Sequence, residues 1–98
     1  MDVGKPQDRG YTVYGSPDCS YCVKVAQLLE SKGISFQYYN VDQYYGRPER
    51  KRFFEQASKV IGQAITTIPV VFLDGEYIGG YQATKVLLDK SDLLTDDF

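Results

Sequence analysis

The sequence predicts one α/β domain, residues 1–98, with the element order β-α-β-α-β-β-α and helices on both faces of a four-stranded mixed sheet. Three observations predict this fold. The hydrophobic pattern changes between the strand period and the helix period along the chain. The chain opens with a strand-helix-strand unit, and such units form parallel crossovers. An Asp-Gly pair between two later strands then predicts an antiparallel hairpin.

The first half of the chain contains the strand-helix-strand unit. Residues 1–9 are polar and are expected to form a loose leader. A β-branched and aromatic run at residues 11–14 ends at Gly15 and predicts a strand. Residues 19–32 carry apolar side chains at helical spacing, which predicts a helix. Alternating apolar side chains over residues 34–41 predict the second strand.

The second half of the chain contains the hairpin. Residues 70–73 are apolar throughout, which predicts a strand covered on both faces, and Asp74-Gly75 predicts the turn that follows it. The other predicted elements, in chain order, are a tyrosine-rich loop at residues 42–46, a helix at 48–61 beginning with Pro48, a return strand at 76–78, a last helix opening at 80–82, and an acidic tail at about residues 90–98 that is expected to fray.

The composition excludes several classes of function. With 43% hydrophobic and 24% charged residues, the chain is typical of a soluble globular domain, and no apolar run reaches the roughly 20 residues that span a membrane. The net charge of −2 argues against a nucleic-acid partner. Histidine is absent, which excludes histidine-based acid–base catalysis, Cys-His nucleophile pairs and zinc sites that mix cysteine with histidine.

The only two cysteines, Cys19 and Cys22, have the spacing Cys-x-x-Cys. Two cysteines cannot complete a tetrahedral zinc site, so a metal site would need ligands from a second chain or a small thiol. The start of the chain lacks a secretory signal pattern, so we expect a reducing, cytoplasmic environment. In that environment such a pair more often cycles or binds metal than forms a structural disulfide.

The positions of the two cysteines favour redox chemistry over two inert thiols. Cys19 lies at the start of the predicted helix, where unpaired N–H groups and the positive end of the helix dipole stabilise a thiolate. Cys22 shares an apolar face with Val25, Ala26 and Leu29 and is expected to be buried. Residues i and i+3 of a helix are neighbours and can close a disulfide. The pattern predicts an exposed attacking thiol and a buried resolving thiol.

Three motifs together resemble the glutaredoxins, which have the thioredoxin fold. They are Cys19-Ser20-Tyr21-Cys22 at a strand-to-helix turn, Thr67-Ile68-Pro69 before the third strand, and Gly79-Gly80-Tyr81 after the fourth. The resemblance covers nearly everything from Tyr11 to about Leu88 and is closest to the small dithiol glutaredoxins that serve ribonucleotide reductase. It implies a cis peptide bond between Ile68 and Pro69.

The resemblance also implies an activity, namely glutathione-dependent reduction of protein disulfides and glutathione mixed disulfides. Cys19 is then the nucleophile, and Cys22 or a second glutathione resolves the mixed disulfide. The implied partners are glutathione and disulfide-containing proteins, with ribonucleotide reductase as a candidate, and the protein is expected to act as a monomer.

Two alternatives to this activity stay open. In the first, two chains carry one [2Fe–2S] cluster as a dimer, ligated by each Cys19 and by two glutathiones, because Ser20 replaces the proline that is most common in the dithiol motif. In the second, a thioredoxin-like donor takes its electrons from a reductase, which Gly79-Gly80-Tyr81 argues against.

The resemblance assigns eight residues to glutathione binding: Tyr21, Lys24, Thr67, Ile68, Pro69, Gly80, Tyr81 and Gln82. The Ile68 backbone is implied to pair with the cysteinyl backbone of glutathione, as a strand edge would. The start of the last helix is implied to hold the γ-glutamyl carboxylate. Lys24 is the candidate for the glycine carboxylate, whereas the basic run at residues 47–52 is interpreted as a solvated helix face.

The sequence also departs from the family pattern. Ser16 stands where many members carry Lys or Arg, and Asp18 directly precedes Cys19, so we expect a less stabilised Cys19 thiolate. Gln82 and Ala83 stand where relatives often carry acidic or hydroxyl residues that contact the γ-glutamyl amine, and Thr84 is a candidate to replace that contact.

Overall fold

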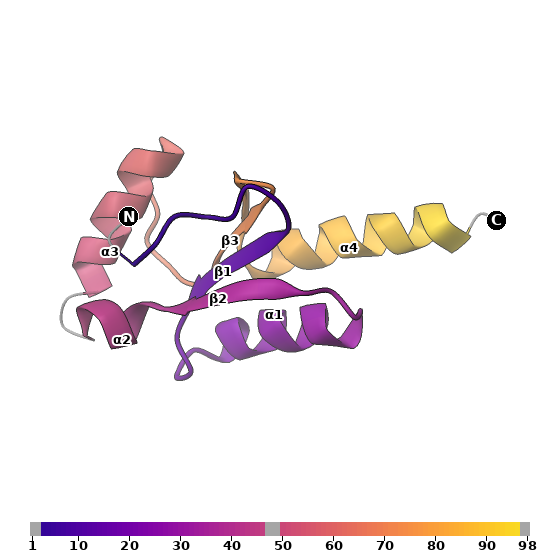
Figure 1. Cartoon of the computed structure of the whole chain (residues 1–98), viewed down its shortest axis with the longest axis horizontal. Helices are drawn as coiled ribbons and strands as arrows, with labels where there is room; N and C mark the ends of the chain where they lie inside the picture. Colours follow the sequence, from indigo (N-terminus) through magenta and orange to yellow (C-terminus); the bar gives the residue numbers. More distant parts are fainter. Residues whose placement is uncertain (1–2, 47–49, 97–98) are drawn as a thin grey trace.

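The computed structural model describes residues 3–46 and 50–96 and shows a four-stranded sheet in the order β2-β1-β3-β4 (Figure 1). The strands are β1 (Tyr11–Gly15), β2 (Phe36–Asn40), β3 (Val70–Leu73) and β4 (Glu76–Gly79). The helices are α1 (Ser20–Ser31), α2 (Val41–Tyr45), α3 (Arg50–Ile61) and α4 (Tyr81–Asp96). The predicted mixed sheet is confirmed, and the element order gains one short helix, α2.

Strand β1 lies in the interior of the sheet and sets the positions of the others. It pairs in parallel with β2 and antiparallel with β3. In the antiparallel ladder, Tyr14 lies opposite Val70. The end of β1 and the start of β3 therefore meet at one edge of the sheet, and the loops that carry Cys19 and Pro69 lie at that same edge.

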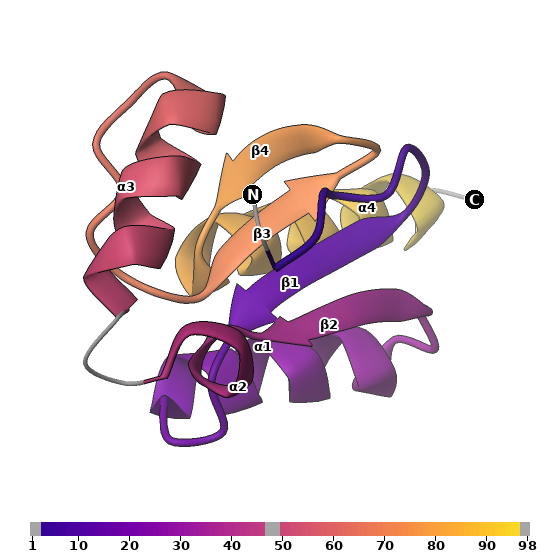
Figure 2. The same ribbon diagram turned by 60° about the vertical axis from the view of Figure 1, so that its left-hand side comes forward.

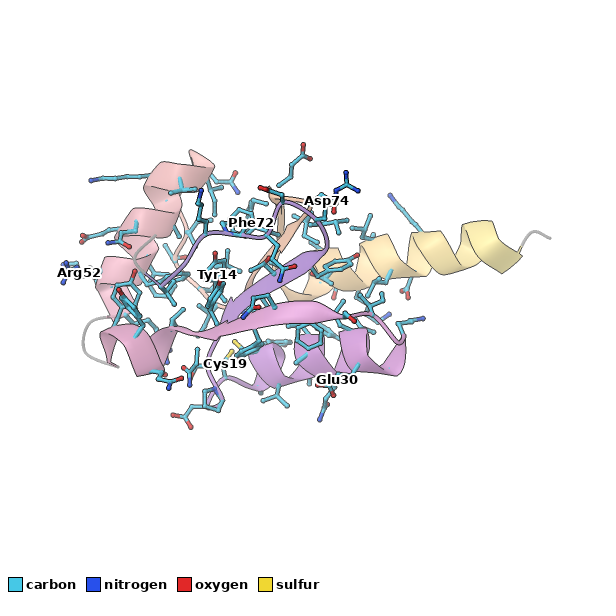
Figure 3. All side chains as sticks on the ribbon, viewed as in Figure 1. Tyr14, Cys19, Glu30, Arg52, Phe72 and Asp74 are labelled. Carbon is cyan, nitrogen blue, oxygen red and sulfur yellow. The ribbon has the colours of Figure 1, made fainter. Side chains whose placement is uncertain are left out.

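Two hydrophobic clusters lie on opposite faces of the sheet, because successive side chains of a strand point in opposite directions. The cluster toward α1 and α4 contains Tyr11, Val13, Val25, Leu29, Val71 and Leu88. The cluster toward α2 and α3 contains Tyr14, Val41, Phe53, Ala57, Ile65, Val70 and Phe72. Figure 2 shows α1 and α4 behind the sheet, and Figure 3 labels Tyr14 beside β1. Each large apolar side chain contributes about 1.5–3 kcal/mol by its burial, so the helices are held on both faces as predicted.

The turn between β3 and β4 has the predicted hairpin geometry. Asp74 has φ 54° and Gly75 has φ 82°, so both central residues are left-handed. A two-residue turn of the type that matches the twist of the flanking strands requires this pair of conformations, and Asp-Gly adopts it readily. The antiparallel pairing of β3 with β4 follows from it.

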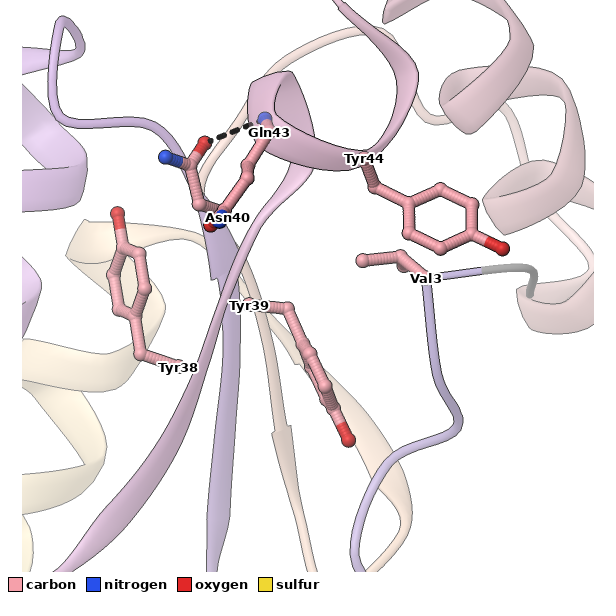
Figure 4. Close-up of a pocket in the computed structure, with 6 residues that line it drawn as sticks. All are labelled: Val3, Tyr38, Tyr39, Asn40, Gln43 and Tyr44. Carbon is pink, nitrogen blue, oxygen red and sulfur yellow. Dashed lines mark hydrogen bonds between the residues drawn. The ribbon is translucent and has the colours of Figure 1, made fainter.

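The prediction of a loop at residues 42–46 is wrong, because α2 (Val41–Tyr45) forms there. Asn40 caps this helix, and its Oδ1 accepts hydrogen bonds from the backbone N–H groups of Asp42 at 3.0 Å and Gln43 at 3.3 Å. Figure 4 shows the bond between Asn40 and Gln43. Such a cap satisfies donors that a helix start leaves unpaired. Val41 is buried, so the helix also contributes to the core.

Two hydrogen bonds hold the described part of the predicted leader against β1. The Tyr14 hydroxyl donates to the Gly4 carbonyl at 2.7 Å, and the Gln7 N–H donates to the Thr12 hydroxyl at 3.0 Å. Gly10, which follows the leader, donates its N–H to Asp74 Oδ1 in the hairpin turn at 2.7 Å. The rest of the predicted leader, residues 1–2, lies outside the described part of the chain.

The first part of the predicted acidic tail lies within α4, which continues to Asp96. Residues 97–98 and the predicted helix start at Pro48 lie outside the described residues. None of the helices over residues 3–46 and 50–96 is long and apolar enough to cross a membrane.

Gly15 provides a stability prediction, because it leaves no room for a side chain. A Cβ atom there would lie 2.6 Å from the Tyr38 hydroxyl oxygen and 2.9 Å from Cys22 Sγ. Overpacking of this kind typically costs about 1–3 kcal/mol. We expect Gly15→Ala to lower the free energy of urea-induced unfolding by that amount. Adding Tyr38→Phe, which removes the closest atom, should recover part of the loss, and a Gly15→Ala variant of undiminished stability would contradict the prediction.

Candidate active site

Cys19 is the N-cap of α1, so the first free donors of the helix point at its sulfur. Its backbone is extended (φ −98°, ψ 116°), and its Sγ accepts a hydrogen bond from the Cys22 N–H at 3.3 Å. Figure 3 labels Cys19 where β1 leads into α1. Cys19 is partly exposed. A negative charge on this sulfur is stabilised by a backbone donor and by the positive end of the helix dipole.

The loop before β3 lies directly against Cys19. The Ile68–Pro69 peptide bond is cis, as predicted. The Cys19 thiol lies 3.6 Å from the Ile68 carbonyl oxygen and donates to it. The Ile68 backbone thus lies beside the Cys19 sulfur, and backbone groups in such a place can pair with an extended peptide.

Cys22 lies one helical turn further on, completely buried on the apolar face with Val25 and Leu29. Burial raises the pKa of the Cys22 thiol to about 12, and its hydrogen bond with Cys19 acts in the same direction. A backbone hydrogen bond from Ser16 and the charge of Arg50 lower this pKa in part. Cys22 therefore keeps its proton at neutral pH.

Beside the two thiols lies a groove of about 620 Å³, between the first turns of α1 and α4 and the loop before β3. It is lined by seven of the eight predicted glutathione-binding residues, Tyr21, Thr67, Ile68, Pro69, Gly80, Tyr81 and Gln82, together with Ala83. The rings of Tyr21 and Tyr81 lie 5.8 Å apart between their centroids. The structure thus brings together residues from three separate segments of the chain.

Two further predicted residues lie elsewhere. Lys24 does not line the groove, and its Nζ lies over the Tyr21 ring, 5.0 Å from the centroid. Thr84 is completely buried, and its hydroxyl donates to the Gly80 carbonyl at 2.8 Å. The prediction that Thr84 contacts a ligand is therefore wrong, because its hydroxyl is occupied inside the first turn of α4.

Sequence reasoning missed a polar network behind the Cys19 loop. The Ser16 hydroxyl donates to Asp42 Oδ2 at 2.6 Å, and Asp42 forms an ion pair with Arg50. For Arg50, the interpretation of residues 47–52 as a solvated face is wrong, since its side chain is only 26% exposed. The signal that could have found this pair was the Asn40 cap, because it places Asp42 in the first turn of a helix.

A Cys-x-x-Cys pair at the start of α1 and a cis proline beside it, on a thioredoxin-like fold, define a thiol-disulfide oxidoreductase. The glutaredoxin family model matches residues 11–78. Glutaredoxin 3 of Escherichia coli is 37% identical over 68 residues, which are 69% of this chain and 72% of that protein. The chain belongs to the glutaredoxin family and is a thiol-disulfide oxidoreductase.

Solved structures agree with this assignment. Glutaredoxin 1 from Francisella tularensis, crystallised with cacodylate, superimposes with a TM-score of 0.66 at 28% identity, over 82% of this chain and 92% of that one. A buckwheat glutaredoxin–glutathione complex superimposes with a TM-score of 0.71 at 24% identity, over 91% of this chain and 76% of that one. The second likeness shows the shared fold.

The contrast between the two thiols predicts a selective reaction. Iodoacetamide reacts with thiolates, and burial holds the pKa of Cys22 at about 12. At pH 7 the reduced, folded protein should therefore be alkylated at Cys19 and not at Cys22, as measured by peptide mass spectrometry. Unfolding in urea should make both cysteines react. Equal labelling of Cys22 in the folded protein would contradict the described burial.

Proposed function

We propose that this protein uses glutathione to reduce glutathione mixed disulfides and protein disulfides. The observation that carries the proposal is the groove of about 620 Å³ beside Cys19, because Ile68, which lines this groove, has its carbonyl oxygen 3.6 Å from the Cys19 sulfur. The buckwheat relative, whose structure is a complex with glutathione, has the same fold.

Glutathione has a peptide backbone and two carboxylates, and the groove together with Lys24 outside it offers groups for each. The Ile68 backbone pairs with the cysteinyl residue, which brings the glutathione sulfur to Cys19. The first turn of α4 has N–H groups without intrahelical acceptors, and it holds the γ-glutamyl carboxylate at Tyr81 and Gln82. Lys24, beyond Tyr21, attracts the glycine carboxylate by its charge.

In the proposed reaction, the Cys19 thiolate attacks the glutathione sulfur of a mixed disulfide. A Cys19–glutathione disulfide forms, and the substrate leaves as a thiolate that takes a proton from water. A second glutathione thiolate then attacks the bound glutathione sulfur, which gives oxidised glutathione and restores the Cys19 thiolate. With a protein disulfide, the Cys19 thiolate attacks one of its sulfurs and forms a Cys19–protein mixed disulfide, and the other sulfur of the substrate leaves as a thiolate. Cys22 then loses its proton to that thiolate and attacks Cys19, which releases the second substrate thiolate and leaves a Cys19–Cys22 disulfide. Two glutathiones reduce this disulfide and become oxidised glutathione.

The setting of this reaction belongs to the same proposal. Glutathione is abundant in reducing compartments, so we place the enzyme in the cytoplasm. It acts as a monomer, because its nucleophile, its resolving thiol and its groove all lie in one chain. Ribonucleotide reductase is the candidate protein acceptor, by resemblance to the small dithiol glutaredoxins.

The two cysteines should contribute differently to this activity. With glutathione as the only reductant, coupled to NADPH through glutathione reductase, Cys19→Ser should abolish turnover because it removes the attacking thiolate. Cys22→Ser should retain reduction of a glutathione mixed disulfide, since glutathione itself resolves it, and should lose reduction of a protein disulfide. If the wild-type protein turned over only with a protein reductase, the proposed reductant would be wrong.

Lys24 should affect substrate binding more than chemistry. Because its charge lies outside the groove, we expect Lys24→Gln to raise KM for a glutathione mixed disulfide by about two- to fivefold, at nearly unchanged kcat. The effect should shrink in 0.5 M salt, because ions screen exposed charges. Lys59→Gln on α3 removes the same charge from an exposed residue away from the groove and serves as the control. An equal KM for both variants would remove Lys24 from the site.

The cluster carrier is the second candidate, and the exposed Ser20 beside Cys19 favours it. Over residues 3–46 and 50–96, no three Cys, His, Asp or Glu side chains come together to hold a metal. A cluster would therefore bind through Cys19 and thiolates from outside the chain. Reconstitution with iron, sulfide and glutathione distinguishes the candidates, since a cluster carrier would become a coloured dimer and its Cys19→Ser variant would not.

A further inference from the structure

Arg50 and Asp42 form an ion pair behind the loop that carries Cys19. Arg50 Nε donates to Asp42 Oδ1 at 2.9 Å, and its Nη2 donates to Oδ2. The side chains of Arg50 and Asp42 are 26% and 17% exposed. A paired geometry of this kind fixes the orientation of both groups, and partial burial limits the screening by solvent.

This ion pair is connected to the nucleophile by hydrogen bonds. Asp42 Oδ2 also accepts from the hydroxyl of Ser16, which is completely buried. The same hydroxyl accepts from the Asp18 N–H at 3.3 Å, and the Ser16 carbonyl accepts from the Cys19 N–H at 3.1 Å. A continuous series of contacts thus runs from α3 through α2 to the cysteine loop.

The charges of the pair act on the thiols as well. The hydrogen bond that Arg50 donates to Asp42 is the largest cause of its raised pKa, and negative charge on Cys19 and Cys22 raises this pKa further. Burial is the largest cause of the raised pKa of Tyr38, and the negative charges of Cys22, Cys19 and Asp42 raise it further. The ionisable groups around the thiols are Asp18 before α1, Tyr21 and Lys24 on α1, Tyr38 on β2, Asp42 on α2, Arg50 on α3 and Tyr81 on α4.

We propose that Arg50 is a positioning residue that supplies the positive charge of this active site, held in place by Asp42 and joined to the cysteine loop through Ser16. A Lys or Arg side chain at position 16 would reach the Cys19 thiol directly, but this chain has the short side chain of Ser16 there. The Ser16 hydroxyl instead donates to the carboxylate of Asp42, and Asp42 holds Arg50 of α3. Arg50 favours the Cys19 thiolate and Asp42 opposes it, so the balance between them sets how readily Cys19 reacts.

A double-mutant cycle that removes the charges of Arg50 and Asp42 tests this proposal. It needs no glutathione, so its outcome is independent of the proposed reductant. The alkylation rate of Cys19 by iodoacetamide, which is uncharged, is measured from pH 5 to pH 9 in a Cys22→Ser background. Below neutral pH, Arg50→Gln should slow alkylation about threefold and Asp42→Asn should speed it about threefold, each equivalent to about half a pH unit. The double variant should lie between the two.

Three further measurements separate charge from structure. Arg50→Lys keeps the charge and should retain most of the wild-type rate. High salt should reduce the difference between Arg50→Gln and Asp42→Asn. Lys51→Gln removes a charge from the adjacent exposed residue and should change nothing.

Two results would overturn the proposal. If both single variants slowed alkylation, the network would only hold the shape of the loop. If neither variant changed the rate, the pair would act only on stability. Should Arg50→Gln fail to fold, Asp42→Asn and Arg50→Lys still decide the question, because an unchanged or slower Asp42→Asn variant contradicts an electrostatic role.

Discussion

The active site depends on the antiparallel register between β1 and β3. Because Tyr14 lies opposite Val70, the chain leaves β1 and enters β3 at the same edge of the sheet. Two loops that are about 50 residues apart in the sequence then meet, and the Cys19 sulfur lies 3.6 Å from the Ile68 carbonyl. A shift of one residue in this register would turn the β3 side chains to the opposite faces and separate the groove from its nucleophile.

The helix that follows β1 gives the two thiols their different environments. Cys19 lies at the cap, outside the first turn, and Cys22 lies three residues later on the face that packs against the sheet. The same three-residue spacing therefore yields a partly exposed sulfur that accepts a backbone hydrogen bond and a buried sulfur that keeps its proton. Gly15 is part of this arrangement, since any side chain there would occupy the space of Tyr38 and Cys22.

Much of the fold and of the groove could be predicted from the sequence, because the relevant signals are local or belong to recognised motifs. Residue type and periodicity located all four strands, Asp74-Gly75 located the hairpin, and the resemblance located the groove and the cis proline. What could not be predicted depends on tertiary partners. A five-residue helix such as α2 has little periodicity, and without it Arg50 has no visible partner. The position of the leader likewise depends on the hydroxyl of Tyr14, which donates to the Gly4 carbonyl.

The buried proton of Cys22 links the redox chemistry of the protein to pH. Because its thiol has a pKa of about 12, Cys22 carries a proton in the reduced state at any physiological pH and carries none in a disulfide. Each two-electron reduction of the Cys19–Cys22 disulfide must therefore take up at least that proton from solution. For a two-electron couple, one such proton lowers the midpoint potential by about 30 mV for each unit of rising pH. Alkalinisation of its surroundings would thus make the reduced enzyme a stronger donor of electrons, with no change in its shape.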